Sequence, residues 1–100
     1  MKEKDIQKLA EEWFKTRHIE FSFYKAPYYG RTRWDIFGVY DYVLADSLGN
    51  IYFYQITTAK HISDRRKKIV AFYERIGFTI PNAFILGWDS KKENFKIEQC

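Results

Sequence analysis

The chain has 100 residues, of which 46% are hydrophobic and 20% aromatic, which suits one domain spanning residues 1–100 with a core that needs no covalent staples. This composition excludes an intrinsically disordered chain, and a single cysteine, Cys100, excludes an intrachain disulfide framework. The net charge of +4 is compatible with a polyanionic partner without establishing one. The sequence has neither a signal-peptide core nor a run of about 20 apolar residues, so we expect an intracellular, cytoplasmic protein without a membrane partner.

The first predicted element is a helix that ends near His18. One apolar stripe with the period of a helix is formed by Ile6, Leu9, Ala10, Trp13 and Phe14. Residues 19–26 then alternate apolar and polar side chains, which predicts a strand. Pro27 and Gly30 break the chain in a short loop.

Residues 33–46 and 50–58 are predicted as two antiparallel strands. A three-residue loop with Gly49 in the left-handed conformation pairs Ala45 with Ile51. The same register places Asp41 directly opposite Gln55, with Cβ atoms about 5 Å apart. A two-residue turn would instead put these two side chains on opposite faces. We favour the first register, because it also aligns apolar residues of both strands on one face.

The rest of the chain predicts a second helix and two more strands. Ser63 is the expected N-cap of the helix and Gly77 its C-terminal stop. The buried side of this helix is predicted to consist of Ile69, Val70, Tyr73 and Ile76. Residues 83–89 and 94–98 are the final strands. The predicted order, αβββαββ, is that of an α+β fold in which two helices flank a central mixed sheet.

Three polar residues, Asp41, Gln55 and Thr57, stand among the apolar residues of the central hairpin. An unpaired carboxylate there costs several kcal/mol of desolvation. One interpretation is a divalent metal site, in which Asp41 supplies a charged oxygen and Gln55 a neutral one to Mg²⁺. The other is that Asp41 accepts hydrogen bonds from Gln55 and Thr57. The residues alone leave both open.

Basic residues are concentrated in two places. The second helix begins with four successive cations, at 65–68, where the macrodipole already presents positive charge. Helix N-termini bind anions, so a phosphate contact explains this arrangement, and an ordinary solvated face is the alternative. Residues 29–34, "YGRTRW", interleave two arginines with aromatic residues that are able to stack on bases.

Taken together, "RWDIFGVYDYVLAD", "YQITT" and "DRRKKI" resemble small phage-type members of the PD-(D/E)XK nuclease superfamily, which includes restriction endonucleases and Holliday junction resolvases. The resemblance covers roughly residues 4 to 90. It implies a restriction-endonuclease-like fold and an Mg²⁺- or Mn²⁺-dependent endonuclease of the junction-resolvase type. Asp41 would be the anchoring metal ligand, Gln55 an auxiliary ligand or a residue that orients water, and Thr57 a donor to water or phosphate.

The resemblance also implies a nucleic-acid partner, with DNA favoured over RNA, and its small footprint is compatible with a two-fold dimer. The residues expected to contact nucleic acid are Arg31, Arg33, Lys60, Arg65, Arg66 and Lys68.

Departures from the family pattern leave catalysis open. Thr57 stands where the family has a lysine, and Gln55 stands where it has a second acid. The glutamate that the family often adds from its first helix has three candidates here, Glu3, Gln7 and Glu11. Asp35 lies about 20 Å from Asp41 along a straight strand, so it shares no metal with Asp41 unless Gly38 bends the chain. We expect it either to support the metal ligands without binding the metal or to hold the Arg31/Arg33 loop. A non-catalytic DNA- or RNA-binding module and a protein-interaction domain are the alternatives.

Overall fold

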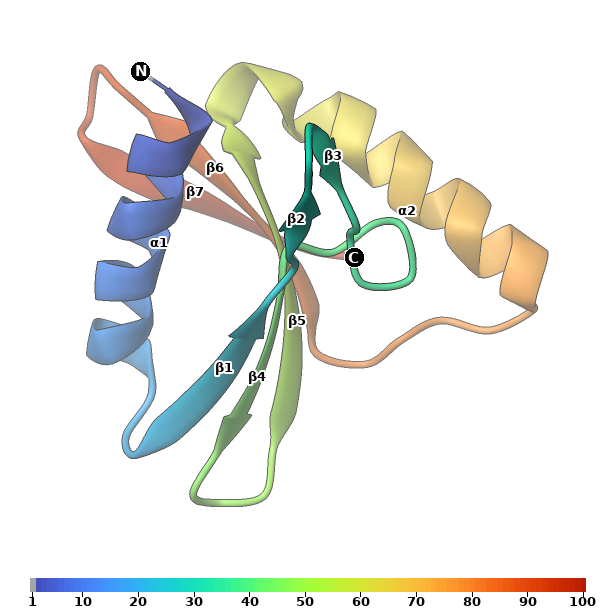
Figure 1. The fold of residues 1–100 in the computed structure, drawn as a ribbon, viewed down its shortest axis with the longest axis horizontal. Coiled ribbons are helices and arrows are strands. Elements are labelled where there is room, and N and C mark those ends of the chain that lie inside the picture. The colour runs from blue at the N-terminus through green and yellow to red at the C-terminus, as the bar shows by residue number, and fades with distance from the viewer. Residues whose placement is uncertain (1) are drawn as a thin grey trace.

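The computed structural model describes residues 2–100 and has two long helices, a central sheet of five strands and a separate two-stranded hairpin (Figure 1). The elements are α1 (Glu3–Arg17), β1 (Phe21–Lys25), β2 (Tyr28–Tyr29), β3 (Thr32–Arg33), β4 (Tyr42–Asp46), β5 (Ile51–Thr58), the 3₁₀ turn η1 (Ala59–His61), α2 (Ile62–Ile76), β6 (Ala83–Asp89) and β7 (Asn94–Gln99). The predicted α+β class with a central mixed sheet is confirmed, whereas the β2–β3 hairpin was not predicted. Within residues 2–100, neither helix is long and apolar enough to span a bilayer.

The strands of the central sheet lie in the order β1-β4-β5-β6-β7. Neighbours are antiparallel except β5 and β6, which are parallel because α2 carries the chain back between them. The predicted hairpin register is confirmed, since Ala45 pairs with Ile51 and Tyr42 with Tyr54. Gly49 has φ +84°, the left-handed conformation that the three-residue loop requires.

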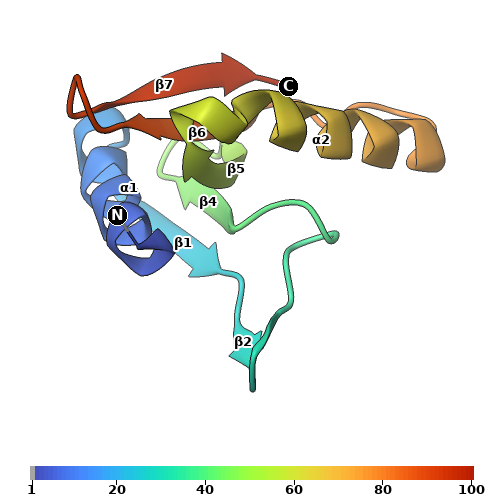
Figure 2. The same ribbon diagram turned by 90° about the horizontal axis from the view of Figure 1, so that it is seen from above.

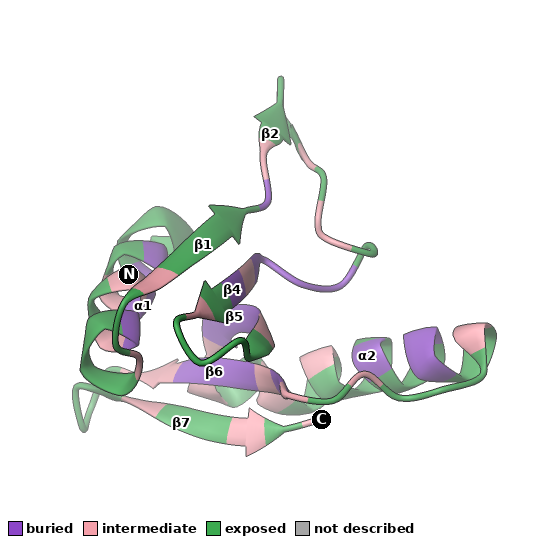
Figure 3. Ribbon diagram, turned by 90° about the horizontal axis from the view of Figure 1, so that it is seen from below, coloured by how far each residue is buried: buried purple, intermediate pink, exposed green. Residues whose placement is uncertain are grey.

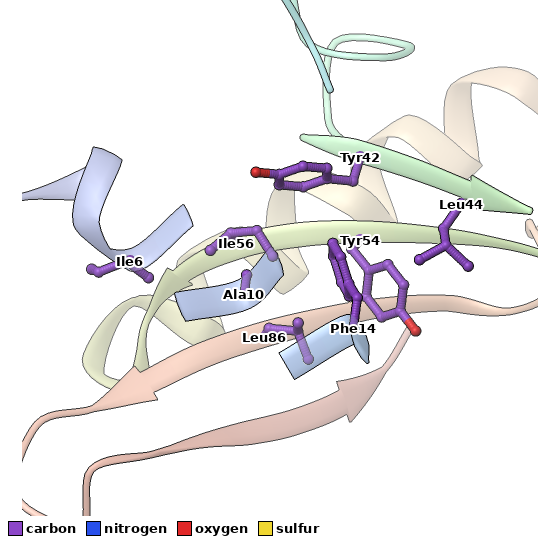
Figure 4. Close-up of a cluster of buried hydrophobic side chains, with 8 residues drawn as sticks. All are labelled: Ile6, Ala10, Phe14, Tyr42, Leu44, Tyr54, Ile56 and Leu86. Atoms are coloured by element: carbon purple, nitrogen blue, oxygen red, sulfur yellow. The ribbon is translucent and has the colours of Figure 1, made fainter. Parts of the chain in front are cut away.

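The predicted stripe of α1 lies against one face of the sheet. Its Ile6, Ala10 and Phe14 are buried, and the helix ends at His18 as expected. Figure 4 shows these side chains interleaved with others from β4, β5 and β6, namely Tyr42, Leu44, Tyr54, Ile56 and Leu86. Because side chains alternate along a strand, this layer takes every second residue of the sheet.

The second core layer lies on the opposite face, under α2. It includes Ile69, Phe72 and Tyr73 of the helix and Phe53 and Ile85 of the sheet. The expectation that Ser63 is the N-cap is wrong. The helix begins one residue earlier, at Ile62, because the preceding 3₁₀ turn runs directly into it. Val70, predicted as buried, is 44% exposed, whereas Gly77 ends the helix with φ +85° as expected.

Gly87 in β6 allows η1 and α2 to lie directly on the sheet. A Cβ atom at this position would come within 2.5 Å of the Ile62 side chain and 3.0 Å of the Ala59 Cα atom. The second contact involves the backbone, which cannot move aside as a side-chain tip can. The close approach fixes the point at which the chain leaves β5 and enters α2.

The largest departure from prediction lies between β1 and β4. Residues 33–46 do not form one strand, because the chain reverses around Gly38 (φ +77°), whose N–H donates to the Asp35 carbonyl. Before this reversal, β2 and β3 form a hairpin that projects away from the sheet (Figure 2). Gly38 therefore supplies the bend that allows Asp35 to approach Asp41.

Candidate functional site

Asp41 lies immediately before β4 and its side chain is buried, with 1% exposure. Its Oδ2 accepts a hydrogen bond from the Ile56 main-chain N–H at 2.7 Å, and its Oδ1 accepts one from the Arg33 guanidinium. The interpretation in which Asp41 accepts from Gln55 and Thr57 is therefore wrong. The partners come instead from the backbone of β5 and from the end of the projecting hairpin.

Arg33 is the centre of an ion-pair cluster. Its guanidinium also lies 2.6 Å from Glu3 of α1 and 3.8 Å from Asp35, and its Cζ atom lies 4.7 Å from the centre of the Tyr28 ring. Asp35 in turn lies 3.8 Å from Lys68 of α2. We call these residues the Arg33 cluster: Glu3, Arg33, Asp35, Asp41 and Lys68. Alternating charges thus connect Glu3 in the first turn of α1 with Lys68 in the middle of α2, and Asp35 lies 3.8 Å from both Arg33 and Lys68.

Burial controls the electrostatics of this cluster. Desolvation raises the pKa of Asp41 to about 6, against the opposing effects of the Ile56 N–H and Arg33. Burial also raises the pKa of Asp35, although Arg33 and Lys68 counteract it. Desolvation alone would lower the pKa of Arg33, but Asp41 and Glu3 raise it above its usual value. The cluster therefore contains a permanent cation opposite a carboxyl, Asp41, whose pKa is raised by burial.

Gln55 and Thr57 are buried, and alternation along β5 places both on the face covered by α2, with Phe53. Among residues 2–100, Gln55 Oε1 has no hydrogen-bond partner. Nor does a hydrogen bond connect Asp41 to Gln55 or Thr57 in this part of the chain. The structure thus buries all three predicted catalytic residues without joining them into one hydrogen-bonded set.

The three helical candidates for an additional acid differ in their surroundings. Glu3 contacts Arg33, and so is one residue removed from Asp41. Gln7 is buried, with 2% exposure. Glu11 accepts a hydrogen bond from the Tyr42 hydroxyl at 2.5 Å. Burial is the main cause of the raised pKa of Tyr42, and this hydrogen bond raises it further. Glu3 is the candidate that the structure connects to the site.

The donor set does not fit a divalent cation in this arrangement. Both Asp41 oxygens already have partners, and one of these is a cation. Gln55 adds no charge. Over residues 2–100 no group of three His, Cys, Asp or Glu side chains is placed to hold a metal ion. Mg²⁺ and Mn²⁺ favour several oxygen ligands with anionic character, which this arrangement does not offer.

The six predicted nucleic-acid contacts fall into two groups. Arg33, Arg66 and Lys68 are paired with carboxylates, and Arg66 makes two 2.5 Å hydrogen bonds to Glu98 of β7. The other three, Arg31, Lys60 and Arg65, form no ion pair within the described residues. Of the six predicted contacts, these three are therefore the ones that no carboxylate pairs with in this part of the chain.

Lys60 lines a cavity of about 420 Å³ between η1 and the β6–β7 turn, together with Thr58, Trp88 and Lys91. Thr58 Oγ1 and Trp88 Nε1 are buried and have no hydrogen-bond partner within residues 2–100. The sequence did not predict this cavity, because Lys60 of η1 and Lys91 of the β6–β7 turn are far apart in the chain. The sequence also did not predict that Arg33 binds Asp41 and Glu3, because both partners lie in other segments of the chain.

Comparison with known proteins adds no assignment, because no protein-family model, curated protein or solved structure matches this chain. Similarity to PD-(D/E)XK nucleases thus remains a prediction from the motifs.

Proposed function

We propose that the protein binds nucleic acid at the N-terminal end of α2, with the projecting β2–β3 hairpin as a second contact (Figures 1 and 2). The observation that supports the proposal is the position of Arg65. It lies in the first turns of α2, its Nε is buried, and no hydrogen-bond partner for that atom exists within residues 2–100. Lys60 precedes the helix, and Arg31 lies in the hairpin, whose base is connected to α2 through Asp35 and Lys68.

Physical chemistry favours a phosphate at this end. The N-terminal turn of a helix carries partial positive charge from its free N–H groups. Cations placed there destabilise an isolated helix by about 0.3–1 kcal/mol each. A bound phosphate reverses the sign of this effect, because it interacts favourably with both the N–H groups and the side chains. Binding of this kind reads charge and geometry, and it does not by itself specify a base sequence.

The test is the salt dependence of binding to a labelled DNA duplex. Replacing Lys60 and Arg65 with Gln is expected to weaken binding and to lower the slope of log K against log salt by about 1 for each phosphate neutralised by the replaced cation. Lys15→Gln is the matched control, because Lys15 is an exposed lysine in the last turn of α1. Unchanged binding in the Lys60 and Arg65 variants would assign these cations to a solvated face. Failure of the wild type to bind DNA or RNA at low salt would reject the proposal and favour a protein partner.

Metal-dependent cleavage of DNA is the second candidate. The sequence motifs are what favour it, and in the structure the carboxylates of Glu3, Asp35 and Asp41 surround the Arg33 guanidinium, so a metal would bind them only after Arg33 moves away. The assay is incubation of branched and duplex DNA with protein in Mg²⁺ or Mn²⁺. Cleavage that is abolished by Asp41→Asn would support it. Suppose the wild type binds DNA without cutting it, and Gln55→Glu combined with Thr57→Lys also fails to cut. The binding function would then stand alone.

A further inference from the structure

Three large aromatic side chains of the projecting hairpin are exposed, and Tyr28 (52%) has Arg33 over its ring, whereas Tyr29 and Trp34 contact each other. Tyr29 is 65% and Trp34 62% exposed, and their rings contact each other edge to face at 5.9 Å. Figure 3 shows the hairpin as an exposed extension that stands clear of the buried sheet. Exposing so much aromatic surface in one place is unfavourable in water, which marks the pair as a contact surface.

The base of this hairpin is fixed. The Trp34 N–H donates to the Pro27 carbonyl at 2.9 Å, which continues the pairing of β2 with β3. Arg33, the residue before Trp34, is held by the carboxylates of the Arg33 cluster and by the Tyr28 hydroxyl. The aromatic pair is therefore presented on an anchored support, which reduces the entropy cost when a partner binds.

We infer that Tyr29 and Trp34 form a stacking platform for unpaired bases, so that the preferred ligand is a single-stranded or branched nucleic acid. This inference rests on the proposed nucleic-acid binding and adds the class of substrate to it. Every base has a π-face, so stacking on Tyr and Trp is tolerant of sequence. In duplex DNA the bases stack on one another, so their faces are not accessible to Tyr29 and Trp34.

The charge of the hairpin favours nucleic acid over a second copy of the chain. Arg31 lies between the two aromatic residues in sequence and forms no ion pair within the described part of the chain. The chain as a whole carries +4, so two copies would bring like charges together at this surface. A polynucleotide supplies both parts of the match, with phosphates for the cation and bases for the rings.

The test combines tryptophan fluorescence with the anisotropy of a short labelled oligo(dT) and of a labelled duplex of the same length. Oligo(dT) is expected to quench the wild-type emission. Trp34→Ala is expected to weaken oligo(dT) binding about 10-fold or more, with little change for the duplex. Trp34→Phe keeps a ring, so it should keep most of the affinity while abolishing most of the quenching. Phe78→Ala removes another exposed aromatic ring, 63% exposed beyond the end of α2, and should change neither.

Several outcomes would overturn the inference. Trp34→Ala that folds, as judged by circular dichroism, and binds oligo(dT) as tightly as the wild type excludes stacking. An equal decrease in affinity for oligo(dT) and duplex indicates a general electrostatic or folding effect instead. A wild-type dimer in light scattering that Trp34→Ala dissociates, with DNA affinity unchanged, assigns the surface to a second copy. If Trp34→Ala binds oligo(dT) normally, or if the surface is a dimer contact, duplex binding that still depends on Lys60 and Arg65 leaves the proposed function intact. If the wild type binds no nucleic acid, both the proposed function and this inference are rejected.

Discussion

The carboxylate of Asp41 accepts the hydrogen bond from the Ile56 N–H that a main-chain carbonyl of a neighbouring strand would otherwise accept. The ladder between β4 and β5 ends at Tyr42 and Tyr54, and beyond it the Ile56 N–H donates to Asp41 Oδ2 at 2.7 Å. A main-chain donor in the centre of the sheet is thus satisfied by a side chain, whose second oxygen binds Arg33. Asp41 therefore completes the hydrogen bonding of the sheet and also anchors the β2–β3 hairpin through Arg33.

Asp41→Ala should destabilise the fold strongly. It leaves the Ile56 N–H without an acceptor and removes one of the carboxylates that hold Arg33, which is itself mostly buried. Breaking a buried pair from one side costs roughly 3–5 kcal/mol. Asp41→Asn removes the charge that faces Arg33 but keeps an oxygen for the Ile56 N–H, so it should cost less than Asp41→Ala. Urea unfolding of both variants measures the difference, and equal stabilities would show that the hydrogen bond to Ile56 contributes nothing.

Titration of Asp41 should be visible in stability. Because burial raises its pKa to about 6, the folded state holds this proton more tightly than the unfolded chain does, with its pKa of 3.8. The contribution of Asp41 to the free energy of unfolding is therefore fully present below pH 3.8. It decreases as the pH rises through about 6, by up to ~3 kcal/mol, and is constant above that.

The measurement is the stability of wild type minus that of Asp41→Asn, taken from pH 4 to pH 7. Subtraction is needed because the lowered pKa values of other carboxyls, Asp46, Asp89 and Glu98, give the opposite trend in both proteins. The difference should shrink as the pH rises. A difference that grows with pH would mean that pairing with Arg33 outweighs burial.

Gln55→Met should stabilise the protein by about 1 kcal/mol, because it removes a buried oxygen that has no partner within residues 2–100 and keeps a similar volume. Gln55→Glu, which puts a charge in the same place, is the contrasting variant and should destabilise it. Thermal unfolding at pH 7 checks both. A decrease in the stability of Gln55→Met would reveal a hydrogen bond that Gln55 needs, and would direct attention to an ordered water or ligand beside it.

Gly87→Ala should destabilise the protein by about 1–3 kcal/mol through overpacking against Ile62 and Ala59. Adding Ile62→Ala to this variant removes the side-chain part of the clash and leaves the contact with the Ala59 backbone. The double variant should therefore be destabilised by less than the sum of the two single variants. Additive effects, measured by urea unfolding, would place the strain in the Ala59 contact alone.

Periodicity predicted most of the fold. The stripe on α1, the alternation in β1 and the turn chemistry at Gly49 depend on nearby residues, so the helix, the strand and the hairpin register are predictable from local patterns. The interruption of the predicted strand between Asp35 and Asp41 was not predicted. Residues 33–46 have apolar content typical of a strand, and the left-handed conformations of Phe37 and Gly38 depend on contacts made elsewhere.

The site was predicted less well than the fold. The isolation of Asp41 among apolar residues correctly marked a buried carboxylate that needs partners. Those partners could not be predicted, because Arg33 reaches Asp41 only after the chain reverses at Gly38, and Glu3 reaches Arg33 only once α1 has packed on the sheet. Ion pairs between distant segments follow from tertiary structure, and alternation along a strand carries no information about them.

The mixed pairing of the sheet has a consequence for the order of folding. β4 and β5 are joined by only residues 47–50, so their hairpin is expected to form early. The parallel pairing of β5 with β6 must wait until all of residues 59–82, including α2, have been spanned. Until then β5 presents an unpaired edge with aromatic and aliphatic residues, and in this interval an unfolded or newly made chain is most exposed to intermolecular strand pairing.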